Sequence, residues 1–182
     1  AEGKGTNTAL GGAIYGSSVS IRNNKTVVFE GNYEKTGSST YTYRLRGLYS
    51  TGQVNLSAAE GNSIKFRDSM YAGGNLILNE QHEGIAQTGD IIFSGEYTKK
   101  HLSELKSSYT AAELRNSLTS TVVGQTELYD GRLIVREGAI LKGAGMTVHT
   151  SASGECNTTV FLQNGHLNQG DNDITFASGT VM

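Results

Sequence analysis

Acidic and basic side chains that could cleave or polarise a sugar occur along the whole chain. Glycoside hydrolysis requires two carboxyl groups that flank the bond to be broken, with nearby cations to polarise it. The positions of these residues in the sequence neither exclude nor favour one cluster. The candidates are Asp68, Asp90, Asp130, Asp171 and Asp173, with Arg44, Arg46, Arg132 and Arg136.

A glycine-aspartate turn near the C-terminal end has the composition of a calcium loop. Gly170-Asp171-Asn172-Asp173 supplies two carboxylates, and Ca²⁺ prefers oxygen ligands. Calcium-binding β-rolls share each ion between tandem copies of such a turn, and this chain has one copy. We therefore interpret the segment as a solvated turn.

The histidines and the single cysteine give little support to a metal site or a nucleophile. His82, His101, His149 and His166 lack the close pairing that places two imidazoles on one ion. Cys156 could pair with His149 or with His166 as a thiolate nucleophile, but no flanking motif supports this. The sequence predicts no metal ion, no cofactor and no catalytic residue.

The charge balance argues against nucleic acid as a partner. The formal net charge of the 182 residues is −2, and no segment carries the density of Lys and Arg that phosphate binding needs. No apolar stretch reaches the length of a membrane-spanning helix, so we expect no membrane insertion by this segment. The chain starts without a charged and apolar leader, and we expect a fragment or a processed form.

Short apolar runs bounded by Gly, Asn, Ser or Asp predict many strands of three to five residues. Examples are Val19-Ser20-Ile21, Val54-Asn55-Leu56 and Ile174-Thr175-Phe176. The chain contains no proline, as expected where each strand uses its N–H groups in hydrogen bonds on both sides. The runs suit a sandwich or a stacked coil, and a period of about 20 residues favours about seven stacked coils.

One segment, from Thr98 to Leu118, has helical spacing instead. Thr110-Ala111-Ala112-Glu113 has the spacing of a capping box at a helix start. The segment is charged on most faces, so we expect one or two short helices outside the stack. The expected packing residues are Leu102, Leu105, Leu114 and Leu118.

Two short motifs recur along the chain. Gly11-Gly12-Ala13-Ile14 precedes Phe29-Glu30-Gly31-Asn32, and Gly73-Gly74 precedes Phe93 in a similar way. Val27 to Lys35 aligns without a gap on Ile91 to Lys99. Such a repeat is typical of stacked units, and it assigns these residues a structural role: Gly for tight corners, Phe for an inner stack and Asn for a turn.

These motifs resemble the repeats of the chlamydial-type polymorphic outer-membrane proteins and related autotransporter passengers. That family carries Gly-Gly-Ala-Ile and Phe-x-x-Asn, as at Gly11 to Ile14 and at Phe29 with Asn32. The segment Gly131-Arg132-Leu133-Ile134-Val135 is similar to the region before its transporter barrel. The resemblance implies an all-β, right-handed parallel β-helix, displayed at a bacterial surface or secreted, that adheres to a host cell-surface or matrix ligand without catalysis.

The resulting expectation is a single domain over residues 1–182, with a helical insertion around residues 98–118. Its function would be adhesion or a structural stem, and the alternative is a carbohydrate-active or other hydrolytic enzyme on the same scaffold. An open stack also ends in unpaired strands. We therefore expect Asp173 to Met182 to be frayed or paired with a second copy of the chain.

Overall fold

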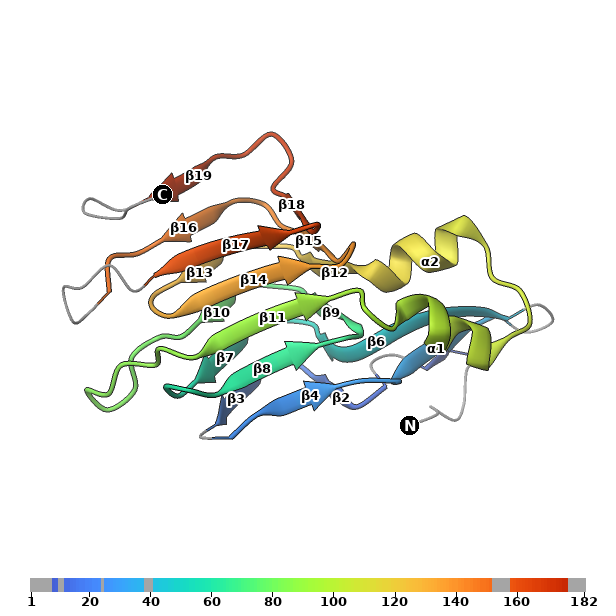
Figure 1. Ribbon diagram of the computed structural model, residues 1–182, viewed down its shortest axis with the longest axis horizontal. Helices are drawn as coiled ribbons and strands as arrows, with labels where there is room; N and C mark the ends of the chain where they lie inside the picture. Colours follow the sequence, from blue (N-terminus) through green and yellow to red (C-terminus); the bar gives the residue numbers. More distant parts are fainter. Residues whose placement is uncertain (1–7, 10–11, 24, 38–40, 152–157, 177–182) are drawn as a thin grey trace.

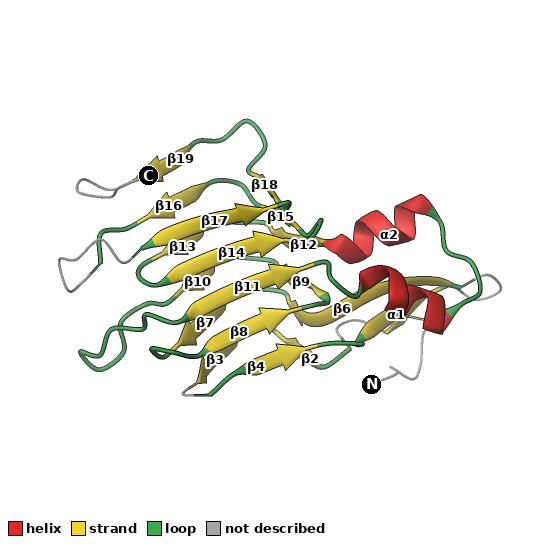
Figure 2. Ribbon diagram, viewed as in Figure 1, coloured by secondary structure: helices red, strands yellow, loops and turns green. Residues whose placement is uncertain are grey.

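The computed structural model describes residues 8–9, 12–23, 25–37, 41–151 and 158–176 of the chain. These residues form a mostly β structure built from parallel sheets, with two helices, as the apolar triplets predict. In Figures 1 and 2, strands from distant parts of the sequence lie side by side in stacked rows.

The strands form three sheets. Among the described residues only the first sheet contains antiparallel strand pairs. Its strands are β1 (Thr8–Ala9), β2 (Ile14–Gly16), β5 (Tyr33–Thr36), β6 (Thr42–Ser50), β9 (Ser69–Ala72), β12 (Thr119–Val122), β15 (Ile140–Lys142) and β18 (His166–Asn168). The second sheet contains β3 (Val19–Asn23), β7 (Val54–Ala58), β10 (Leu76–Leu78), β13 (Thr126–Leu128), β16 (Met146–Val148) and β19 (Ile174–Phe176). The third contains β4 (Val27–Phe29), β8 (Ser63–Phe66), β11 (Asp90–Ser94), β14 (Arg132–Arg136) and β17 (Thr159–Gln163).

The chain visits the three sheets in the same order again and again. From β2 to β17 it makes five complete passes through the first, second and third sheets, and β18 and β19 begin a sixth. This is fewer than the expected seven, because the hairpin of β5 and β6 and the helices use residues that would otherwise form coils. The sandwich alternative is wrong for the described residues, since strands in the second and third sheets pair only in parallel.

The core lies between the three sheets and is built from columns of apolar side chains. Leu56, Leu78, Leu128 and Val148 occupy equivalent positions on successive strands of the second sheet, and each is fully buried. Strand β8 shows the alternation of inward apolar with outward polar residues, in Ser63-Ile64-Lys65-Phe66. Alternation places one side chain from each strand into a layer of the core, so every pass adds one layer.

The helical insertion is present, as α1 (Thr98–Leu105) and α2 (Ala111–Leu118). The predicted capping box is confirmed, because the Thr110 side chain accepts the Glu113 N–H and the Glu113 carboxylate accepts the Thr110 N–H. Both helices lie beside the stacked strands (Figure 2).

The residues that anchor the helices differ from the expected leucines. Leu102 is buried, but Leu105, Leu114 and Leu118 are only partly buried. On α2 the buried residues are polar instead: Glu113 Oε1 accepts the N–H of Tyr43 at 3.1 Å, and Ser117 Oγ accepts the N–H of Leu45 at 3.0 Å. The reason is that α2 meets a strand edge, where free N–H groups of β6 require acceptors.

Candidate functional site

The predicted inner phenylalanines lie in one column of the third sheet. Phe29 and Phe66 stack with ring centroids 4.6 Å apart, and Phe66 and Phe93 stack at 5.3 Å. All three are buried. The aligned residues Val27 and Ile91 also occupy equivalent positions in the structure, because both pair with Ile64 on β8. Sequence reasoning missed Phe66, the middle ring, although the pattern of Ile64-Lys65-Phe66 matches that of its two neighbours.

The two glycine pairs occupy different places in the fold. Gly12 precedes β2, where an added Cβ would lie 2.6 Å from the Tyr33 nitrogen. Gly73 and Gly74 follow β9, at a corner between the first and second sheets, where Gly74 N–H donates to Gly52 O at 3.0 Å. The pairs are therefore not equivalent positions of one repeat. Gly11 is outside the described residues; Ala13 is exposed, and Ile14 on β2 packs against the core.

Asn32 connects its turn to the next coil through Asp68. The Asp68 carboxylate accepts the N–H of Gly31 at 3.0 Å, the N–H of Asn32 at 2.8 Å and the Asn32 side-chain amide at 2.9 Å. Burial raises the pKa of Asp68, while these hydrogen bonds act in the opposite direction. The carboxylate is thus a structural acceptor that fixes the turn after β4.

The other candidate carboxylates and arginines hold separate structural contacts. Asp90 makes a two-pronged ion pair with Arg132 at 2.6 and 2.7 Å, across adjacent strands of the third sheet. Asp130 is buried, where it accepts the Gly131 N–H at 2.8 Å and the Ser151 hydroxyl at 2.7 Å. Asp68, Asp90 and Asp130 each bind different partners, so their contacts give no sign of the two flanking acids that a glycosidase uses.

The arginines of β6 and β14 are also engaged. Arg46 pairs with buried Glu34 at 2.6 Å, Arg44 Nη2 donates to Thr119 O at 2.8 Å, and Arg136 lies 3.6 Å from Glu137. A cation that is fixed by a protein partner is poorly placed to polarise a substrate. Asp171 and Asp173 are exposed, and no group of three potential metal ligands occurs among the described residues.

The histidines lie apart from one another. His149 stacks on Tyr129 at 4.1 Å, and its Nε2 lies 3.3 Å from Glu127. His82 lies beside Glu83, and His166 is exposed on β18. The proposed partner Cys156 is outside the described residues, so the structure gives no geometry for a thiolate pair.

A charged corner that sequence reasoning missed joins the third sheet to α1. Arg67 donates to Glu30 in a short hydrogen bond and lies 3.3 Å from Glu96, and His101 of α1 lies 3.5 Å from Glu30. The hydrogen bond from Arg67 lowers the pKa of Glu30. Glu30 therefore stays ionised near neutral pH, which suits an ion pair that anchors α1 and does not suit a general acid.

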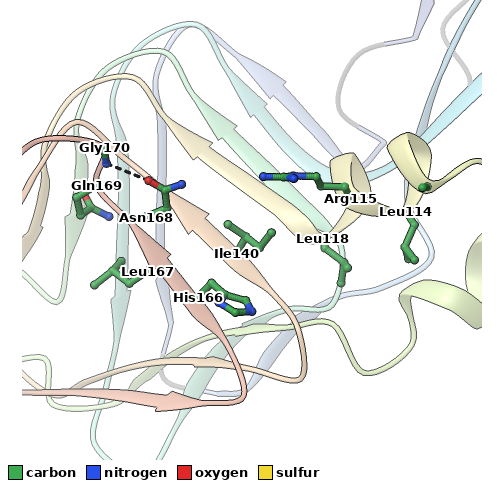
Figure 3. Close-up of a pocket in the computed structure, with 10 residues that line it drawn as sticks. Leu114, Arg115, Leu118, Ile140, His166, Leu167, Asn168, Gln169 and Gly170 are labelled. Atoms are coloured by element: carbon green, nitrogen blue, oxygen red, sulfur yellow. Dashed lines mark hydrogen bonds between the residues drawn. The ribbon is translucent and has the colours of Figure 1, made fainter.

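An open groove of about 650 Å³ lies between α2 and the outer face of the first sheet (Figure 3). Leu114 and Leu118 of α2 form one wall, and Ile140 and His166 are neighbours on β15 and β18. The turn after β18 closes the opposite side with Gln169 and its neighbours. The partly exposed leucines of α2 thus line a surface that a ligand can reach.

No helix within the described residues is both long and apolar enough to cross a membrane. Comparison of the chain with protein-family models, with curated proteins and with solved structures gives no match.

Proposed function

We propose that this chain is a non-enzymatic segment of a bacterial surface or secreted protein of the autotransporter passenger class. In this proposal it acts in adhesion or as a stem that displays other segments. The observation that carries it is the separate structural engagement of the candidate acids Asp68, Asp90 and Asp130. A scaffold of many strands in which these three acids each hold a structural contact is suited to display and contact.

The finer fold that we propose is a right-handed parallel β-helix. The repeated visit to the same three sheets, in which successive passes pair mostly in parallel, supports it, since each pass would close one turn of a coil. Crossover connections between parallel strands of one sheet are right-handed in about 98% of cases. The extended columns, such as Leu56 to Val148, then become the interior of the coil.

A paired assay tests the function against the hydrolytic alternative. We expect the purified chain to bind host cells or an immobilised matrix protein, and to release no reducing ends from a panel of polysaccharides. Release of reducing ends that disappears in Asp90→Asn would overturn the proposal, because that residue would then act as more than the partner of Arg132. Absence of both activities would restrict the role to that of a stem.

We also propose that the last coil pairs with a second copy of the chain. Leu162, Ile174 and Phe176 continue the inward columns of the third and second sheets, yet they are 53%, 41% and 39% exposed. At the opposite end of the column Phe29 is only 7% exposed, so the column is covered at that end and open at the end that Leu162 occupies. Such an open apolar end favours a two-fold, end-to-end contact between identical surfaces.

Sedimentation equilibrium tests this contact. We expect a concentration-dependent dimer that Leu162→Lys and Phe176→Lys convert to monomer, because each places a charge within an apolar contact. Val28→Lys is the matched control, since Val28 is an exposed residue of β4 at the far end of the third sheet. A monomer at all concentrations, or dissociation by Val28→Lys alone, would contradict the proposal.

A further inference from the structure

The groove beside α2 carries several hydrogen-bond donors and no carboxylate among its lining residues. Arg115 is exposed at its rim, and no ion pair of its guanidinium occurs within the described part of the chain. His166 adds a ring nitrogen donor or acceptor. Asn168 Oδ1 accepts the Gly170 N–H at 3.0 Å (Figure 3), which leaves the Asn168 amide nitrogen for another partner. The groove is therefore complementary to a ligand with negative charge and acceptor oxygens.

A buried amide gives a second, independent sign of a ligand. Gln169 is only 5% exposed and lines the groove, and its Oε1 accepts the Gly145 N–H at 3.1 Å. Its Nε2 is buried and has no hydrogen-bond partner within the described residues. Buried polar groups are nearly always hydrogen-bonded in folded proteins. A movement of the Gln169 side chain would bring this donor to an acceptor oxygen in the groove.

The aliphatic wall of the groove favours a peptide over a sugar as its ligand. Leu114, Leu118 and Ile140 offer aliphatic surface, and no Phe, Tyr or Trp is among the lining residues, so the groove lacks the large flat ring on which a sugar usually stacks. An extended peptide supplies all that the groove requires: carboxylates for Arg115, main-chain carbonyls for the amides, and aliphatic side chains for the leucines. The volume of about 650 Å³ lies within the usual range of ligand sites.

We propose that the groove between α2 and the strands β15 and β18 binds an acidic peptide segment that also carries aliphatic side chains. In this arrangement Arg115 binds a carboxylate, and Gln169 Nε2 donates to a main-chain carbonyl once its side chain turns toward the groove. Leu114 and Leu118 cover the aliphatic side chains. The site does not depend on the display role proposed above, since a stem without adhesive activity could still bind such a segment.

Fluorescence anisotropy with defined peptides tests the site. The probe is a labelled Gly-Leu-Glu-Leu-Asp-Gly peptide, and its matched partner has Gln and Asn in place of Glu and Asp. We expect saturable binding of the acidic probe that weakens at high salt, and much weaker binding of the neutral peptide. Arg115→Ala should weaken binding of the acidic probe at least about tenfold, as loss of a charge-assisted hydrogen bond predicts.

Two further variants keep the test decisive. Arg22→Ala removes an exposed arginine from β3 of the second sheet and should leave binding unchanged. Gln169→Leu should weaken both peptides, and circular dichroism would show whether the fold is intact. Absence of saturable binding, equal binding of the two peptides, equal loss in Arg22→Ala, or preference for a glucuronic-acid oligosaccharide over the peptide would each overturn the proposal.

Discussion

Phe66→Ala should lower the free energy of unfolding by about 4 kcal/mol, because it removes the middle ring of a buried aromatic column. The Phe66 ring stacks on Phe29 at 4.6 Å and on Phe93 at 5.3 Å, and its side chain is almost fully buried. Strands above and below are fixed by ladder hydrogen bonds, so the surroundings cannot collapse into the space. The loss therefore includes both the buried area and the cavity.

Urea denaturation of four variants measures this effect. Phe93→Ala should cost about as much as Phe66→Ala, and Phe29→Ala toward the lower end of about 3 to 5 kcal/mol, because Phe29 ends the column. Phe161→Ala is the control: Phe161 lies on β17 and is 41% exposed, so its loss should cost about 0.5 to 1 kcal/mol. Similar losses in Phe66→Ala and Phe161→Ala would show that the column is not a packed core.

The inward columns could be predicted from the sequence because each depends on local pattern alone. Alternation in Ile64-Lys65-Phe66 identifies the inward side chains, and the alignment of Val27 on Ile91 identifies the column they share. The hairpin of β5 and β6 could not be predicted in this way. Tyr33 to Thr36 matches the repeat at its first residues, but it pairs antiparallel with β6, and pattern does not encode the direction of pairing.

The contacts of α2 could not be predicted from the sequence for a different reason. Helical periodicity predicts that leucines face the protein, since it assumes an apolar surface as partner. Here the partner is the edge of β6, whose N–H groups at Tyr43 and Leu45 select Glu113 and Ser117. Because Glu113 and Ser117 face β6 in place of the leucines, Leu114 and Leu118 lie on the wall of the groove. The contact between α2 and β6, which are far apart in the sequence, thus determines both how α2 is anchored and which residues line the groove.

Glu113→Ala should destabilise the protein by about 3 kcal/mol, since one buried carboxylate serves three elements. It accepts the N–H of Thr110 at 2.8 Å as part of the helix cap, and the N–H of Tyr43 on β6 at 3.1 Å. Lys106, which follows α1, donates to it at 3.0 Å. Its removal leaves the Tyr43 donor and the Lys106 charge without this acceptor.

The same contacts predict a dependence of stability on pH. Burial by itself would raise the pKa of Glu113, but the donors of Thr110, Tyr43 and Lys106 outweigh it and hold the pKa at about 2. An unfolded glutamate has a pKa of about 4.3. A carboxyl group with a lowered pKa in the folded state stabilises that state above the unfolded pKa, and the contribution is lost as the pH falls toward 2.

The size of this contribution is about 3 kcal/mol at pH 7, and about half of it should be gone at pH 3. Glu113→Gln lacks the titrating group, so the difference in stability between wild type and this variant should shrink from pH 7 to pH 3. Glu104→Gln on α1 is the control, because Glu104 is exposed and only 3.9 Å from Lys100, an ion pair of little energetic weight. A difference between wild type and Glu113→Gln that stays constant from pH 7 to pH 3 would show that Glu113 does not hold α2 on β6 through its charge.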